Sequence, residues 1–234
     1  MGQAIFITGT DTGVGKTFFS SGLARLLKSR GYSVGVMKPA ETGCATRDGA
    51  LYPEDAWRLR EASECAEPIE KICPYRLPEP LAPSIAAERA GVKIDIDHLL
   101  AVFAAIKAAH DITLVEGAGG LMVPLLPSYT FADFARVAKL PVIVVAANKL
   151  GVINHLLLTL EHASCQGLTL LGYALNRLSD EPSLAAETNR EVLSGLTGVA
   201  CLGELPFLSA GAPTAELFET EIDLRTIELW IGSK

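Results

Sequence analysis

The sequence predicts an α/β protein with a P-loop, in which helices cover both faces of a mostly parallel central sheet. Short β-rich runs alternate with longer helical patterns, as in parallel sheets wrapped by helices. Several of these runs are almost continuously apolar, which is typical of strands covered on both faces. A glycine-rich loop joins the first run to the first helical pattern. The 234 residues suit one hydrophobic core, and we expect a single domain over residues 1–234.

The expected strands are short apolar runs bounded by turn residues. They cover residues 4–8, 33–38, 112–116, 141–146, 168–175 and 199–204. The expected helices follow apolar residues spaced three and four apart. They cover residues 16–30, 96–110, 131–138, 153–166 and 182–193. Gly31 and Gly167 stand just past two of these helices, where a residue in the left-handed conformation ends the last turn.

Two segments depart from this alternation. Residues 39–92 are rich in Pro, Glu and Arg, and we expect only short helical pieces there, such as 54–61 and 83–89. Long excursions from a compact sheet often carry substrate sites. The acidic run at residues 216–228 is expected to form a solvated face.

Composition excludes some classes of partner. The chain is 49% hydrophobic and 20% charged, with a net charge of −7. Because no stretch concentrates Lys or Arg, we expect neither nucleic acid nor a membrane as the main partner. The first residues lack the pattern of a signal peptide. The five cysteines are scattered, form no CxxC pair, and are expected to be free thiols in the cytoplasm.

The strongest motif is the loop at residues 9–17, Gly-Thr-Asp-Thr-Gly-Val-Gly-Lys-Thr. Backbone N–H groups of such a loop wrap around phosphates at a helix N-terminus, where the helix dipole favours negative charge. Lys16 would reach the outer phosphates and the Thr17 hydroxyl would bind Mg²⁺. The strict P-loop pattern requires glycine at position 10; here Thr10 stands there and the glycine is Gly9.

Two further charged residues stand where expected strands end. Glu116 closes the run at 112–116 and precedes a loop of small residues, Gly-Ala-Gly-Gly. P-loop enzymes need a carboxylate near the metal, usually at the end of a neighbouring strand. Lys38 closes the run at 33–38. Because ligands bind beyond the carboxyl ends of parallel strands, we expect both side chains near Lys16.

These motifs, with others in the same order along the chain, resemble the dethiobiotin synthetase family. The matching stretches are the P-loop, Lys38-Pro39, the Glu-Gly-Ala-Gly-Gly loop and, more specific than these, Lys-Leu-Gly-Val-Ile-Asn-His at 149–155. The resemblance continues through Pro-Leu-Ala-Pro-Ser at 80–84, Phe-Ala-Asp at 131–133, Asn176 and Gly-Glu-Leu-Pro at 203–206, and it weakens past about Gly211.

The resemblance implies ATP- and Mg²⁺-dependent closure of 7,8-diaminopelargonic acid with CO₂ or bicarbonate to dethiobiotin, ADP and phosphate, in biotin biosynthesis. It implies a carbamate and a carbamic–phosphoric anhydride as intermediates. Lys16 and Lys38 match the catalytic lysines. The implied magnesium ligands are Thr17, Asp55 and Glu116. The implied nucleotide contacts are Thr12, Gly13, Val14, Gly15, Lys16, Thr17, Phe18, Asp55, Glu116, Gly117, Ala118, Gly119, Asn176, Arg177, Pro206, Phe207 and Leu208.

The resemblance also implies a substrate site shared between two subunits of a homodimer. Thr12 and Thr42 match residues beside the substrate amines. The loop formed by Gly151, Val152, Ile153 and Asn154 matches the segment that receives the substrate carboxylate from the neighbouring subunit. Gly13 stands where some relatives carry Glu, so one contact between loop and nucleotide differs here.

Two other functions compete with the ligase. One is a nucleotide-switch ATPase of the chromosome-partitioning type; such proteins carry an additional lysine early in the P-loop, where this chain has Asp11 and Thr12. The other is an amide ligase of the same superfamily, of the kind that carries a glutaminase domain. The chain is too short to hold that domain as well.

Overall fold

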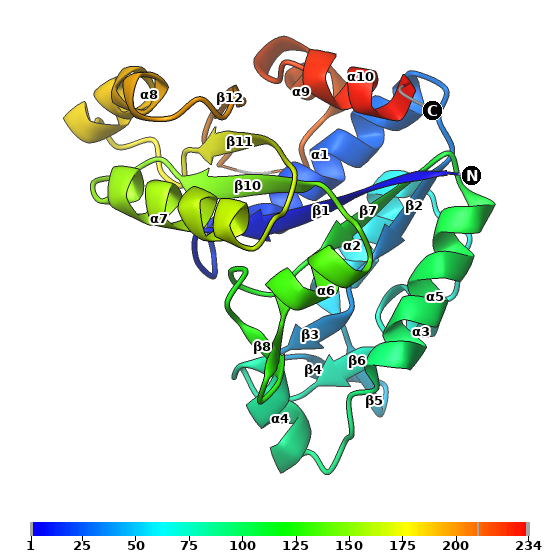
Figure 1. Cartoon of the computed structure of the whole chain (residues 1–234). Helices are drawn as coiled ribbons and strands as arrows, with labels where there is room; N and C mark the ends of the chain where they lie inside the picture. Colours follow the sequence, from blue (N-terminus) through cyan, green and yellow to red (C-terminus); the bar gives the residue numbers. More distant parts are fainter. Residues whose placement is uncertain (1, 210, 233–234) are drawn as a thin grey trace.

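A six-stranded parallel sheet forms the centre of the computed structural model, which describes residues 2–209 and 211–232 (Figure 1). Every pairing in this sheet is parallel. Its strand order is β12 (Cys201–Leu205), β11 (Leu170–Asn176), β10 (Val142–Ala147), β1 (Gln3–Gly9), β7 (Ile112–Glu116) and β2 (Val34–Met37). These are the six strands that the sequence predicts, with bounds that agree within two residues. The α/β class with a parallel central sheet is confirmed.

Helices cover both faces of the sheet. One face packs against α5 (Ile96–Ala109), α6 (Phe131–Val137), α7 (Val152–Cys165) and α8 (Leu184–Leu196). The other face packs against α1 (Lys16–Ser29), α2 (Glu54–Ser63), α9 (Ala215–Glu221) and α10 (Arg225–Gly232). Gly31 and Gly167 have φ angles of 88° and 69°, so both follow their helices in the expected left-handed conformation.

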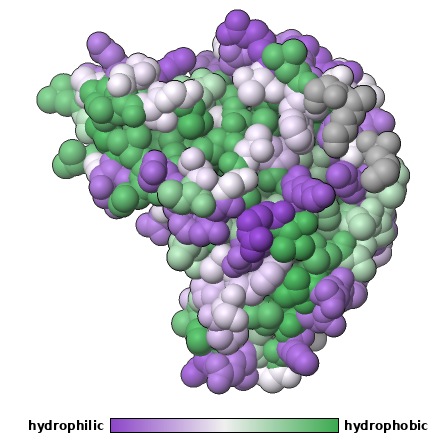
Figure 2. Space-filling view, viewed as in Figure 1, coloured by the Kyte–Doolittle hydropathy of each residue, from purple (hydrophilic) through white to green (hydrophobic). Residues whose placement is uncertain are grey.

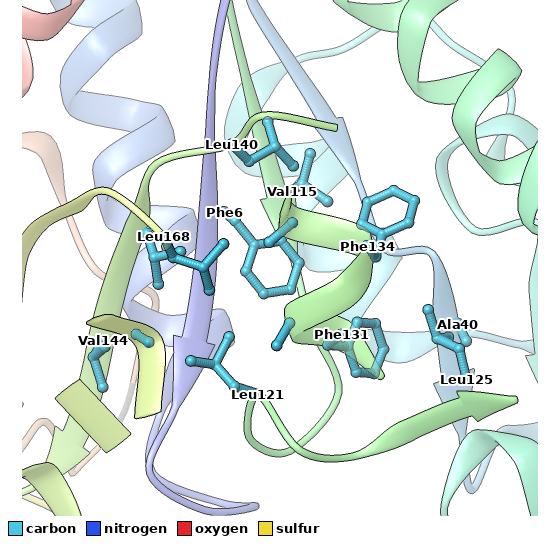
Figure 3. Close-up of a cluster of buried hydrophobic side chains, with 14 of the residues drawn as sticks. Phe6, Ala40, Val115, Leu121, Leu125, Phe131, Phe134, Leu140, Val144 and Leu168 are labelled. Carbon is cyan, nitrogen blue, oxygen red and sulfur yellow. The ribbon is translucent and has the colours of Figure 1, made fainter. Parts of the chain in front are cut away.

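Alternate residues of β1 supply the two hydrophobic cores. Ile5 and Ile7 face α1, whereas Phe6 faces α6 and packs against Phe131 with ring centroids 6.1 Å apart (Figure 3). Both phenylalanines are fully buried, and burying such a side chain contributes about 1.5–3 kcal/mol. Since both faces of β1 are apolar, the strand reads as a continuous hydrophobic run, which is why it is recognisable in the sequence.

The excursion at residues 39–92 contains more than short helices, so the expectation of helical pieces alone was wrong. It holds two small sheets: β3 (Ala40–Thr42) pairs with β6 (Tyr75–Leu77), and β4 (Ala45–Arg47) pairs with β5 (Ala50–Tyr52). It also holds α2, α3 (Ile69–Ile72) and α4 (Pro83–Arg89). A hairpin of β8 (Pro124–Leu126) and β9 (Tyr129–Thr130) precedes α6. Strands of two or three residues are too short to display a period of two.

The acidic C-terminal run, expected to form a solvated face, folds into α9 and part of α10. Its carboxylates at Glu216 and Glu219 are exposed, as expected. Its apolar residues pack inward, because Phe218 and Ile227 are fully buried against the α1 face of the sheet. Phe218 stacks obliquely on Phe19 of α1, with ring centroids 5.7 Å apart. The segment therefore closes one of the two cores.

Two further observations complete the fold. The five cysteines all carry free thiols. Among the residues that the structure describes, no helix is both long enough and apolar enough to cross a membrane.

Candidate active site

The phosphate loop follows β1 and leads into α1 at the carboxyl edge of the sheet. α1 begins at Lys16, and Gly15 before it has a φ of 90°. A Cβ at Gly15 would lie 1.9 Å from the Asn176 side-chain nitrogen, so only glycine fits there. A Cβ at Gly9 would lie 2.7 Å from a methyl of Val14. Gly9 stands one place upstream of the glycine in the strict motif, and its lack of a side chain leaves space for Val14.

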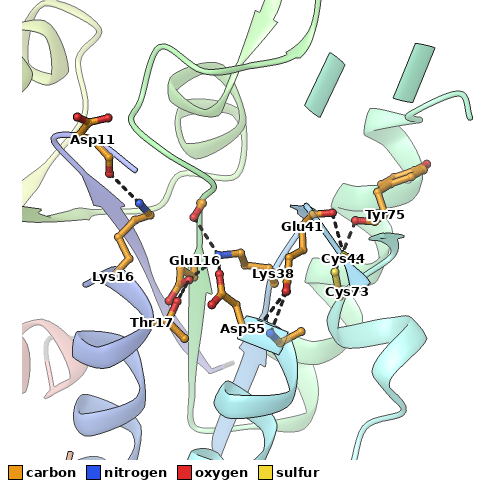
Figure 4. A network of polar contacts seen from close by, with 12 residues as sticks. Asp11, Lys16, Thr17, Lys38, Glu41, Cys44, Asp55, Cys73, Tyr75 and Glu116 are labelled. Carbon is orange, nitrogen blue, oxygen red and sulfur yellow. Dashed lines mark hydrogen bonds and ion pairs between the residues drawn. The ribbon is translucent and has the colours of Figure 1, made fainter. Parts of the chain in front are cut away.

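Four polar side chains meet beside this loop, three of them on α1, α2 and β7 and the fourth directly after β2 (Figure 4). Lys38 Nζ lies 2.5 Å from Glu116 Oε1 at the end of β7 and 2.9 Å from Asp55 Oδ2 in the first turn of α2. The Thr17 hydroxyl, in the first turn of α1, donates to Glu116 Oε1 at 2.8 Å. Lys38 and Glu116 are buried, at 2% and 0% exposed. The structure thus brings together residues that lie up to 99 positions apart in the sequence.

The pKa values of the two lysines of this site move in opposite directions. Burial by itself would lower the pKa of Lys38, but the carboxylates of Glu116 and Asp55 outweigh it and raise that pKa. Burial, and then the nearby charge of Lys38, lowers the pKa of Lys16 to about 8. Burial would raise the pKa of Asp55, but Lys38 outweighs it and lowers that pKa. Lys38 is therefore a fixed cation, and Lys16 is a cation that its surroundings disfavour.

The surroundings of Lys16 favour the binding of an anion. Its ammonium donates to the Asp11 carbonyl at 2.9 Å, which is a neutral partner. Phosphate oxygens bound within the loop would replace this carbonyl with charged acceptors, which form stronger hydrogen bonds to an ammonium.

The oxygen atoms of the site suit a magnesium ion. Glu116 Oε2 is buried, and within the described residues it has no hydrogen-bond partner. Buried carboxylate oxygens usually have a partner, so this one calls for a ligand. The Thr17 hydroxyl and the Asp55 carboxylate complete a set of hard oxygen donors, the kind that Mg²⁺ prefers. Thr17, Asp55 and Glu116 therefore fit the metal that the sequence implies for them.

A cavity of about 740 Å³ opens over this cluster. Many residues expected from the sequence line it: Thr12, Gly13, Gly15, Lys16, Thr17, Phe18, Lys38, Thr42, Asp55, Ala118 and Gly119. Other residues that line the cavity were not predicted from the sequence to do so, namely Glu41, Arg58, Val123 and residues 80–83. Arg58 follows Asp55 by three positions on α2, a spacing that places both on one helix face and could have indicated it.

The remaining expected residues do not line this cavity. The Asn176 amide donates to the Val14 carbonyl at 3.0 Å, which places Asn176 directly behind the phosphate loop. Arg177 N donates to the Leu205 carbonyl at 2.9 Å, so Arg177 stands next to the segment formed by Pro206, Phe207 and Leu208. The expected carboxylate-binding residues lie at the start of α7, where Val152 lines a small second cavity together with residues 10–14.

A buried amide network fixes the loop that precedes α7. Asn189 on α8 donates to Asn148 Oδ1 at 2.8 Å and to the Lys149 carbonyl at 3.2 Å. Asn148 in turn donates to Glu204 at 2.8 Å and to the Ala186 carbonyl at 2.9 Å. Both asparagines are buried. The network ties the carboxyl ends of β10 and β12 to α8 and so holds the start of the loop in place.

We expect Asn189→Ala to lower the free energy of unfolding by about 1–3 kcal/mol. The substitution leaves the Asn148 carbonyl oxygen buried without its donor, and an unsatisfied buried group costs about that much. Urea denaturation measures the change. Thr188→Ala, at the exposed neighbouring position on α8, is the control and should stay within about 0.5 kcal/mol of the parent. Equal stability of Asn189→Ala and the parent would contradict the structural role of the network.

The fold and the site define a P-loop nucleotide-binding protein, with a glycine-rich loop at the start of a helix and a carboxylate on the neighbouring strand. A family model described as AAA domain matches residues 3–214. Among solved structures, the chain resembles the septum site-determining protein MinD complexed with Mg-ADP from Pyrococcus horikoshii. The two share 19% identity and a TM-score of 0.55, over 88% of this chain and 82% of that one. At this identity the likeness concerns the fold alone.

The chain belongs to the ATP-dependent dethiobiotin synthetase family, whose members are ligases. It is 41% identical to the ATP-dependent dethiobiotin synthetase BioD of Thermodesulfovibrio yellowstonii, over 89% of this chain and 90% of that one. It is 38% identical to the enzyme of the same name from Bacillus subtilis, over 88% of both chains.

Proposed function

We propose that the chain uses ATP and Mg²⁺ to close 7,8-diaminopelargonic acid and CO₂ into dethiobiotin, with release of ADP and phosphate. The observation that carries the proposal is that Lys16, Thr17, Lys38 and Asp55 line one cavity beside the phosphate loop. The buried Glu116 contacts two of them, Thr17 and Lys38. Family membership supplies the substrate class. The free thiols and the need for ATP favour the cytoplasm as the site of the reaction.

The reaction joins two anions and then closes a ring. One substrate amine adds to CO₂ and gives a carbamate, which attacks the γ-phosphorus of ATP and displaces ADP. The second amine attacks the carbonyl of the resulting anhydride, expels phosphate and closes a cyclic urea. Each neutral amine loses one proton in the process and keeps one N–H in the cyclic urea, and none of these bonds is made to a protein atom. A cavity that positions reactants and neutralises charge is therefore sufficient.

The lysines and the metal would counter the repulsion between carbamate and phosphate. Lys16, on the phosphate loop, would bind the β- and γ-phosphates. Lys38, held between two carboxylates, would stand beside the carbamate and the transferring phosphoryl group. Mg²⁺, held by Thr17, Asp55 and Glu116, would supply further positive charge beside the phosphates. Since a buried cation costs no reorganisation at the moment of reaction, Lys38 would stabilise developing charge effectively.

The phosphates of the nucleotide and the amines of the diamine would share the cavity beside the phosphate loop. Residues 13–18 and 117–119 would surround the phosphates, and Asn176 with Arg177 and residues 206–208 would contact the base. Thr12 and Thr42 line the same cavity as Lys38 and would contact the substrate amines. Binding both amines in one cavity supplies the orientation that ring closure requires.

We also propose that two copies of the chain pair through the α7 face, so that the loop at residues 151–154 of one copy receives the substrate carboxylate of the other. Figure 2 shows hydrophobic residues gathered over the region of α7 and α8. Three large apolar side chains there are strongly exposed: Leu150 at 86%, Leu158 at 62% and Leu184 at 82%. Apolar surface gathered in this way is typical of an interface.

We expect Leu158→Glu to weaken dimerisation at least about tenfold, since a charge at the centre of an apolar interface must be desolvated. Sedimentation velocity across a range of protein concentrations measures the change. Leu229→Glu is the matched control, because Leu229 on α10 is also 74% exposed but lies outside this face. A parent chain that stays monomeric, or a variant that dimerises as the parent does, would contradict the proposal.

Phosphate release tests the proposed reaction. The chain is incubated with ATP, Mg²⁺ and bicarbonate, with and without 7,8-diaminopelargonic acid, and the product is identified by mass. We expect release to depend on the diamine, and chelation of the metal to stop it. Hydrolysis that ignores the diamine and gives no cyclic product would instead favour a switch ATPase.

A further inference from the structure

One acidic residue of the cavity wall has no role in the reaction described above. Glu41 lies on β3, three positions after Lys38, and is only 6% exposed. A buried carboxylate is costly unless hydrogen bonds compensate for the lost water. The partners of Glu41 therefore indicate why an acid is buried at this place.

The Glu41 carboxylate binds the start of α2. Its Oε1 accepts a hydrogen bond from the Asp55 N–H at 2.9 Å, and its Oε2 accepts one from the Ala56 N–H at 3.0 Å. These are the second and third residues of the helix, whose N–H groups an N-cap side chain normally satisfies. The residue in the N-cap position is Pro53, which has no side-chain oxygen to offer. Glu41 thus caps α2 from another element, and its negative charge suits the positive end of the helix dipole.

This cap acts on a residue of the proposed metal site. Asp55 carries both the N–H that Glu41 binds and the carboxylate that faces Lys38 (Figure 4). The hydrogen bond from the Asp55 N–H holds the backbone of this residue. Since the side chain extends from that backbone, the bond also restricts the positions that the Asp55 carboxylate can reach. Lys38 and Glu41 are only three positions apart in the chain. This short segment therefore carries Lys38 itself and, through Glu41, also holds the backbone of its partner Asp55.

We propose that Glu41 is a positioning residue, which holds the first turn of α2 so that Asp55 can bind the magnesium ion. The inference rests on the proposed function for the metal site itself. Beyond that function, we expect the affinity for the metal to depend on the Glu41 carboxylate, which binds backbone N–H groups and not the metal. Partners that orient the ligands of a metal commonly change its affinity by about 10–100-fold.

Binding of Mn²⁺, measured in the presence of saturating ADP by the electron paramagnetic resonance signal of the free ion, tests this role. We expect Glu41→Ala to weaken Mn²⁺ binding at least about tenfold and to leave ADP binding without metal unchanged. Glu41→Gln keeps one acceptor oxygen and should fall between the parent and Glu41→Ala. Asp95→Ala is the matched control, because the Asp95 carboxylate also caps a helix, here α5 from its own N-cap position and away from the site, by accepting from the His98 N–H at 3.1 Å.

Parent-like Mn²⁺ affinity in Glu41→Ala would overturn the inference, and so would an equal loss in Asp95→Ala. If Glu41→Ala does not fold, Glu41→Gln decides: weakened Mn²⁺ binding supports the positioning role and parent-like binding overturns it. Failure of the parent chain with ADP to bind Mn²⁺ would be a different result, because it would refute the proposed metal site as a whole.

Discussion

Replacing Lys38 with alanine is expected to lower turnover by about 10²–10³-fold, the cost of removing one preorganised group that stabilises developing charge, and to destabilise the fold. Lys38 is buried between Glu116 and Asp55, at 2.5 and 2.9 Å. Without it, two carboxylates face each other with no cation between them. Removing one partner of a buried ion pair costs about 3–5 kcal/mol.

The loss of stability should depend on pH. Lys38 lowers the pKa of Asp55 below its ordinary value of 3.8. Stability from this pair is therefore present above pH 4 or so and is lost as the pH falls through the lowered pKa. Chemical denaturation at pH 7 and at lower pH measures this: the difference between the variant and the parent should be largest at pH 7 and should shrink under acid conditions.

Lys28→Ala is the control for this experiment. Lys28 also pairs with a carboxylate, that of Glu64, but the pair lies at the surface. Exposed ion pairs contribute about 0–1 kcal/mol. A Lys38→Ala variant that matched Lys28→Ala in stability, or that kept the turnover of the parent, would contradict the account of the buried pair.

Replacing Lys16 with alanine is expected to lower turnover by about 10³-fold or more without a comparable loss of stability. Lys16 would neutralise the phosphates at the moment of transfer, which is the largest contribution that a P-loop makes to such chemistry. In the folded chain its pKa falls to about 8, first because of burial and then because of Lys38. The fold therefore disfavours the Lys16 cation below that pH, and removing the side chain relieves this cost.

Turnover and urea denaturation of the Lys16→Ala variant, measured side by side at pH 7, separate the two effects. The two lysines thus make contrasting predictions: Lys38 supports both the reaction and the fold, whereas Lys16 supports the reaction alone. A large loss of stability in Lys16→Ala would show that the ammonium has a structural role, and near-parent turnover would remove Lys16 from the mechanism.

The sequence predicts the central sheet well and the excursion from it poorly. Strands β1 and β10 are covered on both faces, so they appear as continuous apolar runs that end at turns. By contrast, β3 and β6 have three residues each, and contacts with the rest of the fold, rather than local pattern, set their conformation. Tertiary contacts of this kind override propensity, and a single sequence does not display them.

In the candidate site, too, the sequence predicts some residues and contacts and not others. Lys16 and Thr17 stand in a motif whose spacing fixes their place, and Lys38 and Glu116 stand near strand ends that meet at one edge of the sheet. Their proximity could be predicted from topology. The partners of Glu41 could not, because they depend on how α2 packs against β3. An isolated Glu after a strand resembles a surface residue in the sequence.

The most direct test of the central claim follows oxygen atoms through the reaction. The chain is given freshly dissolved CO₂ labelled with oxygen-18, together with ATP, Mg²⁺ and 7,8-diaminopelargonic acid, and the phosphate and the cyclic product are analysed by mass. A carbamate that attacks the γ-phosphorus leaves one labelled oxygen in the phosphate and the other in the urea carbonyl. We predict this division of the label. Phosphate without label would mean that water attacks ATP, and it would contradict the ligase mechanism.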